Sequence, residues 1–208
     1  MVSSPSLLRK RVNNEKTKGR GDNLRPFLFL MDIRQAADIV KKIADGFEDA
    51  CIKALQSASD DAVRAVSEQL MSGLDGEDAY LEPTYDEDPY FQEIKWYLTE
   101  NGVRYHGSEG YKRWKETITK PKRGPMLDLP ARPVEVPNLW IDGTFHGSIH
   151  AVNTSLGIDI RATGGRSAEI VGKYGDEILM LGTKARKYML VEHIIPGIDD
   201  FLNKCGYR

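Results

Sequence analysis

Residues 32–71 read DIRQAADIVKKIADGFEDACIKALQSASDDAVRAVSEQLM, and this stretch decides the fold of the chain. Its apolar residues recur at steps of three and four, the spacing of one face of an α-helix. Asp32 can cap the start of a helix, and Ser-Ala-Ser-Asp at 57–60 offers a second capping signal. We predict a helix from Asp32, a break near Ser57 and a second helix ending about Gly73. Burying a large apolar side chain contributes roughly 1.5–3 kcal/mol, so we expect this stripe to be core, with Ile33, Val40, Ile43, Phe47 and Leu55 among its members.

The segment before this stretch, residues 1–30, is polar and basic, with Arg9, Lys10 and Arg11 in succession. Such a segment cannot bury a core of its own. We interpret it as a flexible, disordered basic arm. The alternative is an arm whose Arg9, Lys10 and Arg11 contact DNA or an acidic partner surface.

Acidic residues crowd the segment 74–90, and Tyr80, Tyr85 and Tyr90 are spaced through it. Carboxylates suit calcium, but the ligand order of an EF-hand is absent, so we predict no metal site. A tyrosine combines an apolar ring with a polar tip. We therefore expect a solvated loop whose tyrosines pack on the domain or on a partner.

Two shorter helices and a connector are predicted in the middle of the chain. One helix covers 90–100 and ends at Asn101-Gly102, and the other covers 108–118 and ends before a proline. Between residues 120 and 137 there are five prolines, which fix backbone angles and remove amide donors. This part is predicted to be an extended connector.

The segment 138–162 predicts a small antiparallel sheet. Phe145, Ile149 and Ala151 fall on one face of a strand, and a second alternating run follows a turn at residues 153–155. Gly143 and Gly147 are expected to be structural, marking tight backbone at the entrance of the first strand.

The remaining residues predict a short helix over 168–174, closed by Gly175, and a terminal helix over 183–205, interrupted around Pro196. The predicted fold class is therefore α+β, with N-terminal helices, a small antiparallel β-sheet and a C-terminal helix after the disordered arm. We expect residues 31–208 to form a single domain. Its parts are a helical region (32–119), the proline-rich connector (120–137) and the sheet with the C-terminal helix (138–208).

Composition sets limits on the function. The chain has 208 residues, a formal net charge of −2 and 40% hydrophobic residues, which is ordinary for a soluble globular protein. No apolar stretch approaches the roughly 20 residues that span a bilayer, so no membrane partner is expected. Cys51 and Cys205 lie far apart and suggest a reducing compartment. The first residues lack the apolar region of a secretory signal, so we expect synthesis in a cytoplasm.

Catalytic motifs do not emerge from the sequence, and we expect neither an enzyme nor a cofactor. His146 and His150, on a predicted strand, would stand about 13 Å apart and could not share a metal ion. The glycines at 164–165 are not followed by the Gly-Lys-Ser/Thr of a phosphate-binding loop. A small hydrolase without a recognised motif remains one alternative.

The segment 141–149, Ile-Asp-Gly-Thr-Phe-His-Gly-Ser-Ile, resembles an element of phage minor tail and tail-completion proteins. A D-T-G-x-L-x-x-S-I pattern is typical of these families, and here Gly143 and Thr144 invert the Thr-Gly order. Ile-Pro-Gly-Ile at 195–198 resembles the segment before their last helix. Four further segments, in their order along the chain, resemble virion proteins of phages of Bacteroides and its relatives: 68–75, the acidic stretch with tyrosines that follows it, 111–115 and 173–179. The resemblance covers most of residues 60–205.

This resemblance implies a non-enzymatic structural protein of the virion, made in the host cytoplasm. It would act at the neck or tail end, joining head to tail or completing the tail by forming a ring with its own copies or with other phage proteins. The alternative is a nucleic-acid-binding accessory protein, which would bind DNA through the basic arm with steep salt dependence.

Closure of such a ring requires two different surfaces on each subunit. Apolar residues at 189–195 spread around more than half of the terminal helix. They either meet another subunit or lie between the sheet and the helix that begins at Asp32. Our interface candidates pair this helix with the acidic loop: Met189, Val191, Ile195, Tyr80, Tyr85 and Tyr90.

Overall fold

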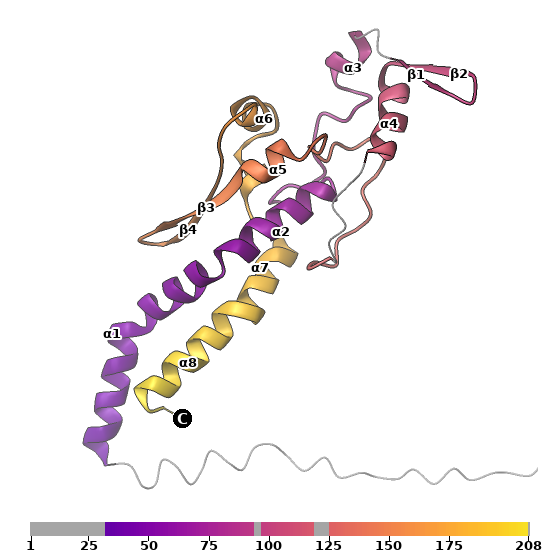
Figure 1. Ribbon diagram of the computed structural model, residues 1–208. Coiled ribbons are helices and arrows are strands. Elements are labelled where there is room, and N and C mark those ends of the chain that lie inside the picture. Colours follow the sequence, from indigo (N-terminus) through magenta and orange to yellow (C-terminus); the bar gives the residue numbers. More distant parts are fainter. Residues whose placement is uncertain (1–31, 94–96, 119–124, 208) are drawn as a thin grey trace, which may run out of the picture.

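The computed structural model describes residues 32–93, 97–118 and 125–207 (Figure 1). The arm predicted over residues 1–30, with Arg9, Lys10 and Arg11, lies outside this described part. The described fold is α+β, as predicted, with helices and two small antiparallel hairpins. None of the described helices combines the length and the apolar character needed to cross a bilayer.

Helices α1 (Ile33–Ser57) and α2 (Ser59–Met71) confirm the predicted pair of helices and the break between them. Asp32 caps α1: its side chain accepts the Arg34 N–H at 2.9 Å, and its own N–H donates to the Gln35 side chain at 3.3 Å. This reciprocal arrangement is a capping box. The two helices therefore follow each other with a bend at the linking residue (Figure 1).

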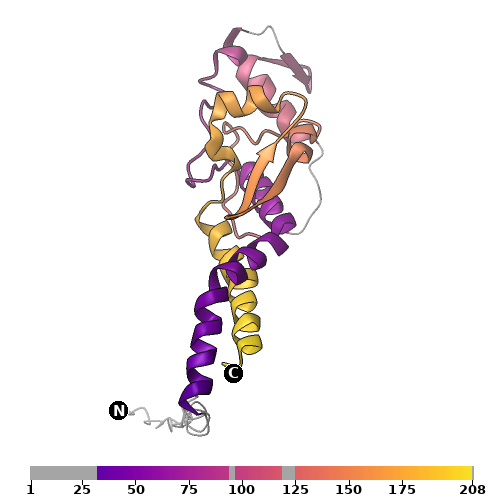
Figure 2. The same cartoon turned by 90° about the vertical axis from the view of Figure 1, so that its left-hand side faces the viewer.

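The C-terminal helix is interrupted, as predicted. Its parts are α7 (Thr183–Met189), a π-helical turn η3 (Leu190–Ile194) and α8 (Ile195–Cys205). Helix α8 runs antiparallel to α1 and lies beside it in both views (Figures 1 and 2). We call α1 together with residues 183–205 the stalk.

Glycines allow the two helices of the stalk to approach closely. A Cβ atom added at Gly46 would lie 2.9 Å from the Phe201 ring, and one added at Gly197 would lie 2.6 Å from the Cβ of Ala54. Contact at this distance leaves no room for a larger side chain.

The main core forms around α2. Strands β3 (Ile149–Thr154) and β4 (Gly157–Ala162) pair antiparallel, which confirms the predicted hairpin, and β3 packs on α2. Helix α6 (Ser167–Tyr174), ended by Gly175 as predicted, and the 3₁₀ turn η2 (Asp176–Leu179) follow. The largest cluster of buried apolar side chains joins these elements: Val66, Leu70, Leu81, Val136, Phe145, Ile149 and Ile178.

The strand predicted to include Phe145 and Gly147 begins later than expected. Residues 144–148 form the short helix α5 (Thr144–Ser148) instead. Asp142 accepts the Thr144 N–H at 2.9 Å, and Gly143 has a φ of 88°. This local turn starts a helix where alternation alone predicted a strand.

The helix predicted over 90–100 is also wrong. The chain forms the short helix α3 (Pro89–Glu93) and then strands β1 (Tyr97–Glu100) and β2 (Val103–His106). Asn101 and Gly102, expected to end a helix, both have positive φ and form the two-residue turn of a hairpin. Helix α4 (Gly107–Thr117) follows and agrees with its prediction. The described part of the connector, from residue 125, contains no helix or strand.

One buried polar side chain links α2 to the turn before α7. The Gln69 side chain is 1% exposed. It donates to the carbonyls of Asp75 at 3.3 Å and Met180 at 3.1 Å, and it accepts the N–H of Gly182 at 2.9 Å. Gln69 therefore satisfies three backbone groups that lie outside regular structure.

We expect Gln69→Leu to lower the free energy of unfolding by roughly 2–4 kcal/mol, because it leaves these backbone groups buried without partners. Urea denaturation followed by circular dichroism measures this change. Gln35→Leu is the control. Gln35 is exposed and makes one capping contact, so its loss should cost under about 1 kcal/mol. Equal effects of the two substitutions would contradict this role for Gln69.

Candidate functional site

The stalk carries apolar side chains that nothing in the described structure covers. Ile33 is 86% exposed, Val40 is 66% exposed and Phe47 is 43% exposed. The prediction that these three side chains are core is therefore wrong. They continue through exposed Ala37 and Ala44 along one face of α1. We call this face, from Ile33 to Cys51, the open stripe.

A second apolar stripe on the same helix explains why the open stripe is left uncovered. Helix α8 packs on α1, where Ile39 lies near Gly206 and Gly46 meets the Phe201 ring. The half-buried residues 43 and 50 share this face of α1. At 100° per residue, the centres of the two stripes lie roughly 100° apart on α1. One neighbouring helix cannot cover both.

The terminal helix also presents apolar side chains. Val191 and Ile195 are each 46% exposed, so these two interface candidates lie on the surface. Met189, the third candidate, is 2% exposed and packs against Ala58 and Ala62. Met189 cannot meet another subunit, and its prediction as an interface residue is corrected.

The acidic loop supplies two exposed tyrosines rather than three. Tyr80 is 44% exposed and Tyr90 is 61% exposed. Tyr85 is 3% exposed, with its ring centroid 5.3 Å from that of Phe91 and 5.0 Å from that of Tyr111, both edge-on. Its burial raises the pKa of the Tyr85 hydroxyl. The interface prediction for Tyr85 is corrected, because its ring belongs to this internal aromatic cluster.

Carboxylates of this loop bind groups of the protein itself. Asp78 accepts the Thr183 N–H at 3.0 Å, and hydrogen bonds from the side chain and the backbone of Thr183 lower the pKa of the Asp78 carboxyl. Asp86 pairs with Lys112 at 2.9 Å, and buried Asp88 pairs with Lys173. Across the described ranges, no group of three or more metal-binding side chains is close enough to hold an ion.

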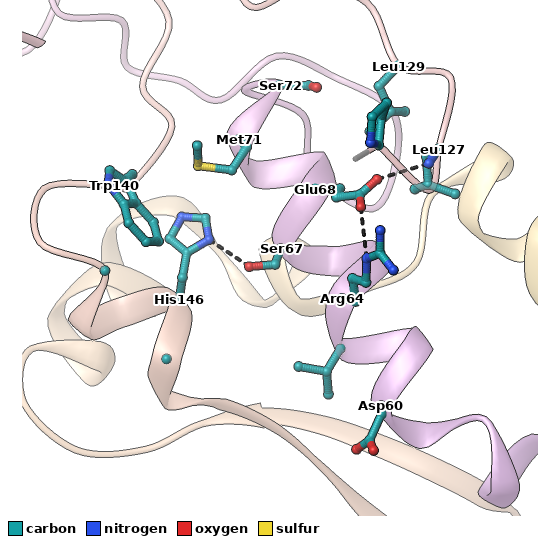
Figure 3. A pocket seen from close by; sticks show the side chains of 14 residues that line it. Asp60, Arg64, Ser67, Glu68, Met71, Ser72, Leu127, Leu129, Trp140 and His146 are labelled. Atoms are coloured by element: carbon teal, nitrogen blue, oxygen red, sulfur yellow. Dashed lines mark hydrogen bonds and ion pairs between the residues drawn. The ribbon is translucent and has the colours of Figure 1, made fainter. Parts of the chain in front are cut away.

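A cavity of about 500 Å³ lies between α2, the connector and α5 (Figure 3). Trp140 and His146 form one side, and Ser67 and Arg64 of α2 form the other. Apolar side chains of the connector, among them Leu127, complete its lining.

One polar feature of this cavity is a chain of hydrogen bonds through His146. The Ser67 hydroxyl lies 2.8 Å from Nδ1 of His146, and Nε2 lies 3.0 Å from the Asn138 carbonyl. A carbonyl only accepts, so Nε2 carries the hydrogen and Nδ1 accepts from the Ser67 hydroxyl. Sequence patterns could not find this pair, because Ser67 and His146 are 79 residues apart.

The order hydroxyl, imidazole, acceptor resembles that of a catalytic serine, but its electrostatics differ. Burial, together with the charge of nearby Lys115, lowers the pKa of His146 to about 4. A base with this pKa is weak at neutral pH. A backbone carbonyl stands where a carboxylate would stabilise the imidazolium. The hydrogen bonds through the neutral His146 side chain thus act as a structural clamp that holds α5 on α2.

Glu68 makes a second clamp in the same cavity. Its carboxylate accepts the N–H groups of Met126 at 2.8 Å and Leu127 at 2.9 Å, and it pairs with Arg64 at 3.1 Å (Figure 3). The protein's own carboxylate thus engages two backbone donors of the kind that bind anionic ligands.

Two glycines line the cavity with different roles. Gly143 has a φ of 88°, and an added Cβ would lie 2.6 Å from the Trp140 ring. Gly143 is thus structural. Gly147 is helical, and an added Cβ would meet nothing within 4 Å. Its prediction as tight backbone at a strand entrance is corrected, because the chain there is helical and its Cα faces open space.

We expect Gly143→Ala to cost at least about 1–2 kcal/mol of stability, because alanine is strained at positive φ and would displace Trp140. Gly147→Ala should be neutral or stabilise by up to about 1 kcal/mol, because alanine suits a helix better than glycine. Chemical denaturation of the matched pair measures the contrast. Equal costs at both positions would contradict the assignment.

The pKa of His146 predicts a pH dependence of stability. Between pH 6.5, the ordinary pKa of histidine, and about 4, the unfolded chain binds a proton at this position that the folded chain does not. Stability from His146 should therefore be lost as the pH falls through this window, by up to about 1.4 kcal/mol per pH unit.

Urea denaturation at several pH values measures this loss. His146→Gln should reduce the slope, because glutamine does not titrate. Identical slopes for wild type and His146→Gln would show that the imidazole is not held neutral.

Comparisons of the chain with models of protein families, with curated proteins and with solved structures found no match. The resemblance to phage tail proteins therefore depends on the short motifs alone. Inferences about function depend on the exposed surfaces of the stalk and the acidic loop and on the cavity.

Proposed function

We propose that this chain is a structural protein of a tailed-phage virion that acts at the neck or tail end as one subunit of a ring. The exposed apolar side chains of the terminal helix of the stalk, Val191 and Ile195, carry this proposal. Apolar side chains of this size gain roughly 1.5–3 kcal/mol each when they are buried, so an exposed series of them favours binding to another protein. The sequence resemblance supports the place in the virion.

Ring closure by identical subunits needs a head-to-tail contact between two different surfaces. Val191 and Ile195 of the stalk are one candidate, and Tyr80 and Tyr90 of the acidic loop are the other. The loop begins at the C-terminal end of α2, whereas Met189, just before Val191, packs on Ala58 and Ala62 at the other end, and the 13 residues of α2 span about 20 Å. This separation favours contact between neighbouring subunits over contact within one.

Purified virions test the proposal. We expect quantitative mass spectrometry to find this protein at a fixed copy number that matches the symmetry of a neck or tail ring. Its absence from the particles, together with binding of DNA that weakens steeply with salt, would instead support the alternative of a nucleic-acid-binding accessory protein.

Charge substitutions on the stalk test the surface. Val191→Glu and Ile195→Glu should each leave thermal unfolding nearly unchanged but reduce incorporation into particles, because the side chains are half exposed. Leu156→Glu is the matched control at an 83% exposed apolar residue of the β3–β4 turn, and it should be incorporated normally. Normal incorporation of both stalk variants would contradict the contact.

A further inference from the structure

We propose that two copies of the chain pair through the open stripe, with their α1 helices antiparallel and related by a two-fold axis. This contact goes beyond the ring interface and uses a different surface. It covers α1 up to Cys51, whereas Ile195 lies near Gly197, which packs on Ala54 further along α1. The pairing is a property of the free protein, so its test does not depend on a role in virions.

The spacing of the open stripe is that of a helix that faces another helix. Its residues alternate steps of four and three, in the order Ile33, Ala37, Val40, Ala44, Phe47 and Cys51. This seven-residue repeat keeps one seam of side chains facing a partner helix. Its angle of roughly 100° to the stripe under α8 is close to the angle between the two neighbours of each helix in a four-helix bundle.

The sizes of the side chains favour a second copy in antiparallel order. One antiparallel register engages all six positions. It places Ile33 against Cys51, Ala37 against Phe47, and Val40 against Ala44 of the other copy. Each layer then joins a bulky side chain to a small one, so the two helices stay evenly spaced along the contact.

Charges beside the seam agree with the same register. Arg34, Lys41 and Glu48 each follow a seam residue and occupy its outer flank. The register places Arg34 beside Glu48 of the other copy, twice by symmetry, and flanking charges of this kind set orientation in coiled coils. Within the described residues, no ion pair engages Arg34 or Glu48.

Lys41 of one copy lies opposite Lys41 of the other copy, near the two-fold axis. Asp38 and Asp45, three and four residues away on the same helix, offset this like charge. A parallel pair would instead direct the flanking charges toward the residues at 36, 43 and 50, on the side of α1 that α8 occupies.

The extent of the stripe suits a reversible dimer. The 19 residues from Ile33 to Cys51 span about 27 Å along the helix axis. At the width of one helix, roughly 10 Å, the contact covers about 270 Å² on each copy, or about 540 Å² in total. An area of this size is typical of a weak, reversible association rather than a permanent one.

Cysteine crosslinking tests the register in the full chain. Ile33→Cys in a Cys205→Ser background should form a covalent dimer on oxidation, through Cys51 of the second copy. Adding Cys51→Ser should abolish it, because the two introduced thiols at position 33 then lie at opposite ends of the contact. A dimer that persists without Cys51 indicates a parallel pair and overturns the proposal. Asp49→Cys in a Cys51→Ser, Cys205→Ser background, off the seam, is the control and should not crosslink.

Sedimentation equilibrium tests the occupant of the open stripe. We expect the wild type to approach twice the 23.4 kDa chain mass, and Val40→Glu to be a folded monomer, whereas Leu156→Glu should still dimerise. Arg34→Glu and Glu48→Arg should each weaken dimerisation by about tenfold, and the double variant should restore it.

Restoration is expected only when the same chain supplies both sides of the contact. A wild-type protein that stays monomeric at all concentrations overturns the proposal. Coverage of the stripe by residues 27–31 of the same chain would give this result. A double variant as weak as the single ones also overturns it, because Arg34 of one copy would then not face Glu48 of the other.

Discussion

The burial of α2 is the constraint on which the rest of the structure depends. Ala62, Ala65, Val66 and Leu70 are fully hidden, and α2 contacts the β3 strand, α7 and η2. The two alanines allow neighbouring segments to come close, since contact at a small side chain brings backbones together. Gln69 is the polar residue of the same face. Its side chain hydrogen-bonds backbone groups of Asp75, Met180 and Gly182, which lie outside helices and strands. A helix of three and a half turns thus fixes where the hairpin, the connector and the terminal helix lie.

The stalk follows from this arrangement. Helix α1 continues beyond the core that surrounds α2, and there α8 is its neighbour among the described elements (Figures 1 and 2). A helix with two apolar stripes and one neighbour leaves one stripe exposed, and exposed apolar area is the main source of affinity between proteins. The charges that flank the stripe contribute less energy, because exposed ion pairs are worth about 1 kcal/mol or less, and their effect is on orientation. Apolar contact would thus hold the partner, and Arg34 and Glu48 would set its direction.

The polar residues of the cavity have a structural explanation. The connector is rich in proline and forms no helix or strand after residue 125, so few of its backbone groups can pair with one another. Side chains on either side of the cavity supply the missing partners, with Glu68 accepting two connector amides and His146 donating to the Asn138 carbonyl. The lowered pKa of His146 results from this burial. The serine, histidine and glutamate side chains that line the cavity therefore hold three segments of the chain together.

Local signals in the sequence determined most of the helices. The capping box at Asp32, the break before Ser59, the stop at Gly175 and the interruption of the terminal helix depend on neighbouring residues, so they were predictable. The segment 90–100 was not, because Asn-Gly ends a helix or turns a hairpin equally well, and only pairing with β2 decides between them. The apolar residues of α1, Met189 and Tyr85 were likewise identified in the sequence, but not which of them are covered. The tertiary structure decided that Met189 and Tyr85 are internal and that Ile33, Val40 and Phe47 are exposed, since burial depends on which segments pack alongside. The Ser67–His146 pair lay beyond sequence reasoning for the same reason: folding, rather than spacing along the chain, brings the two side chains together.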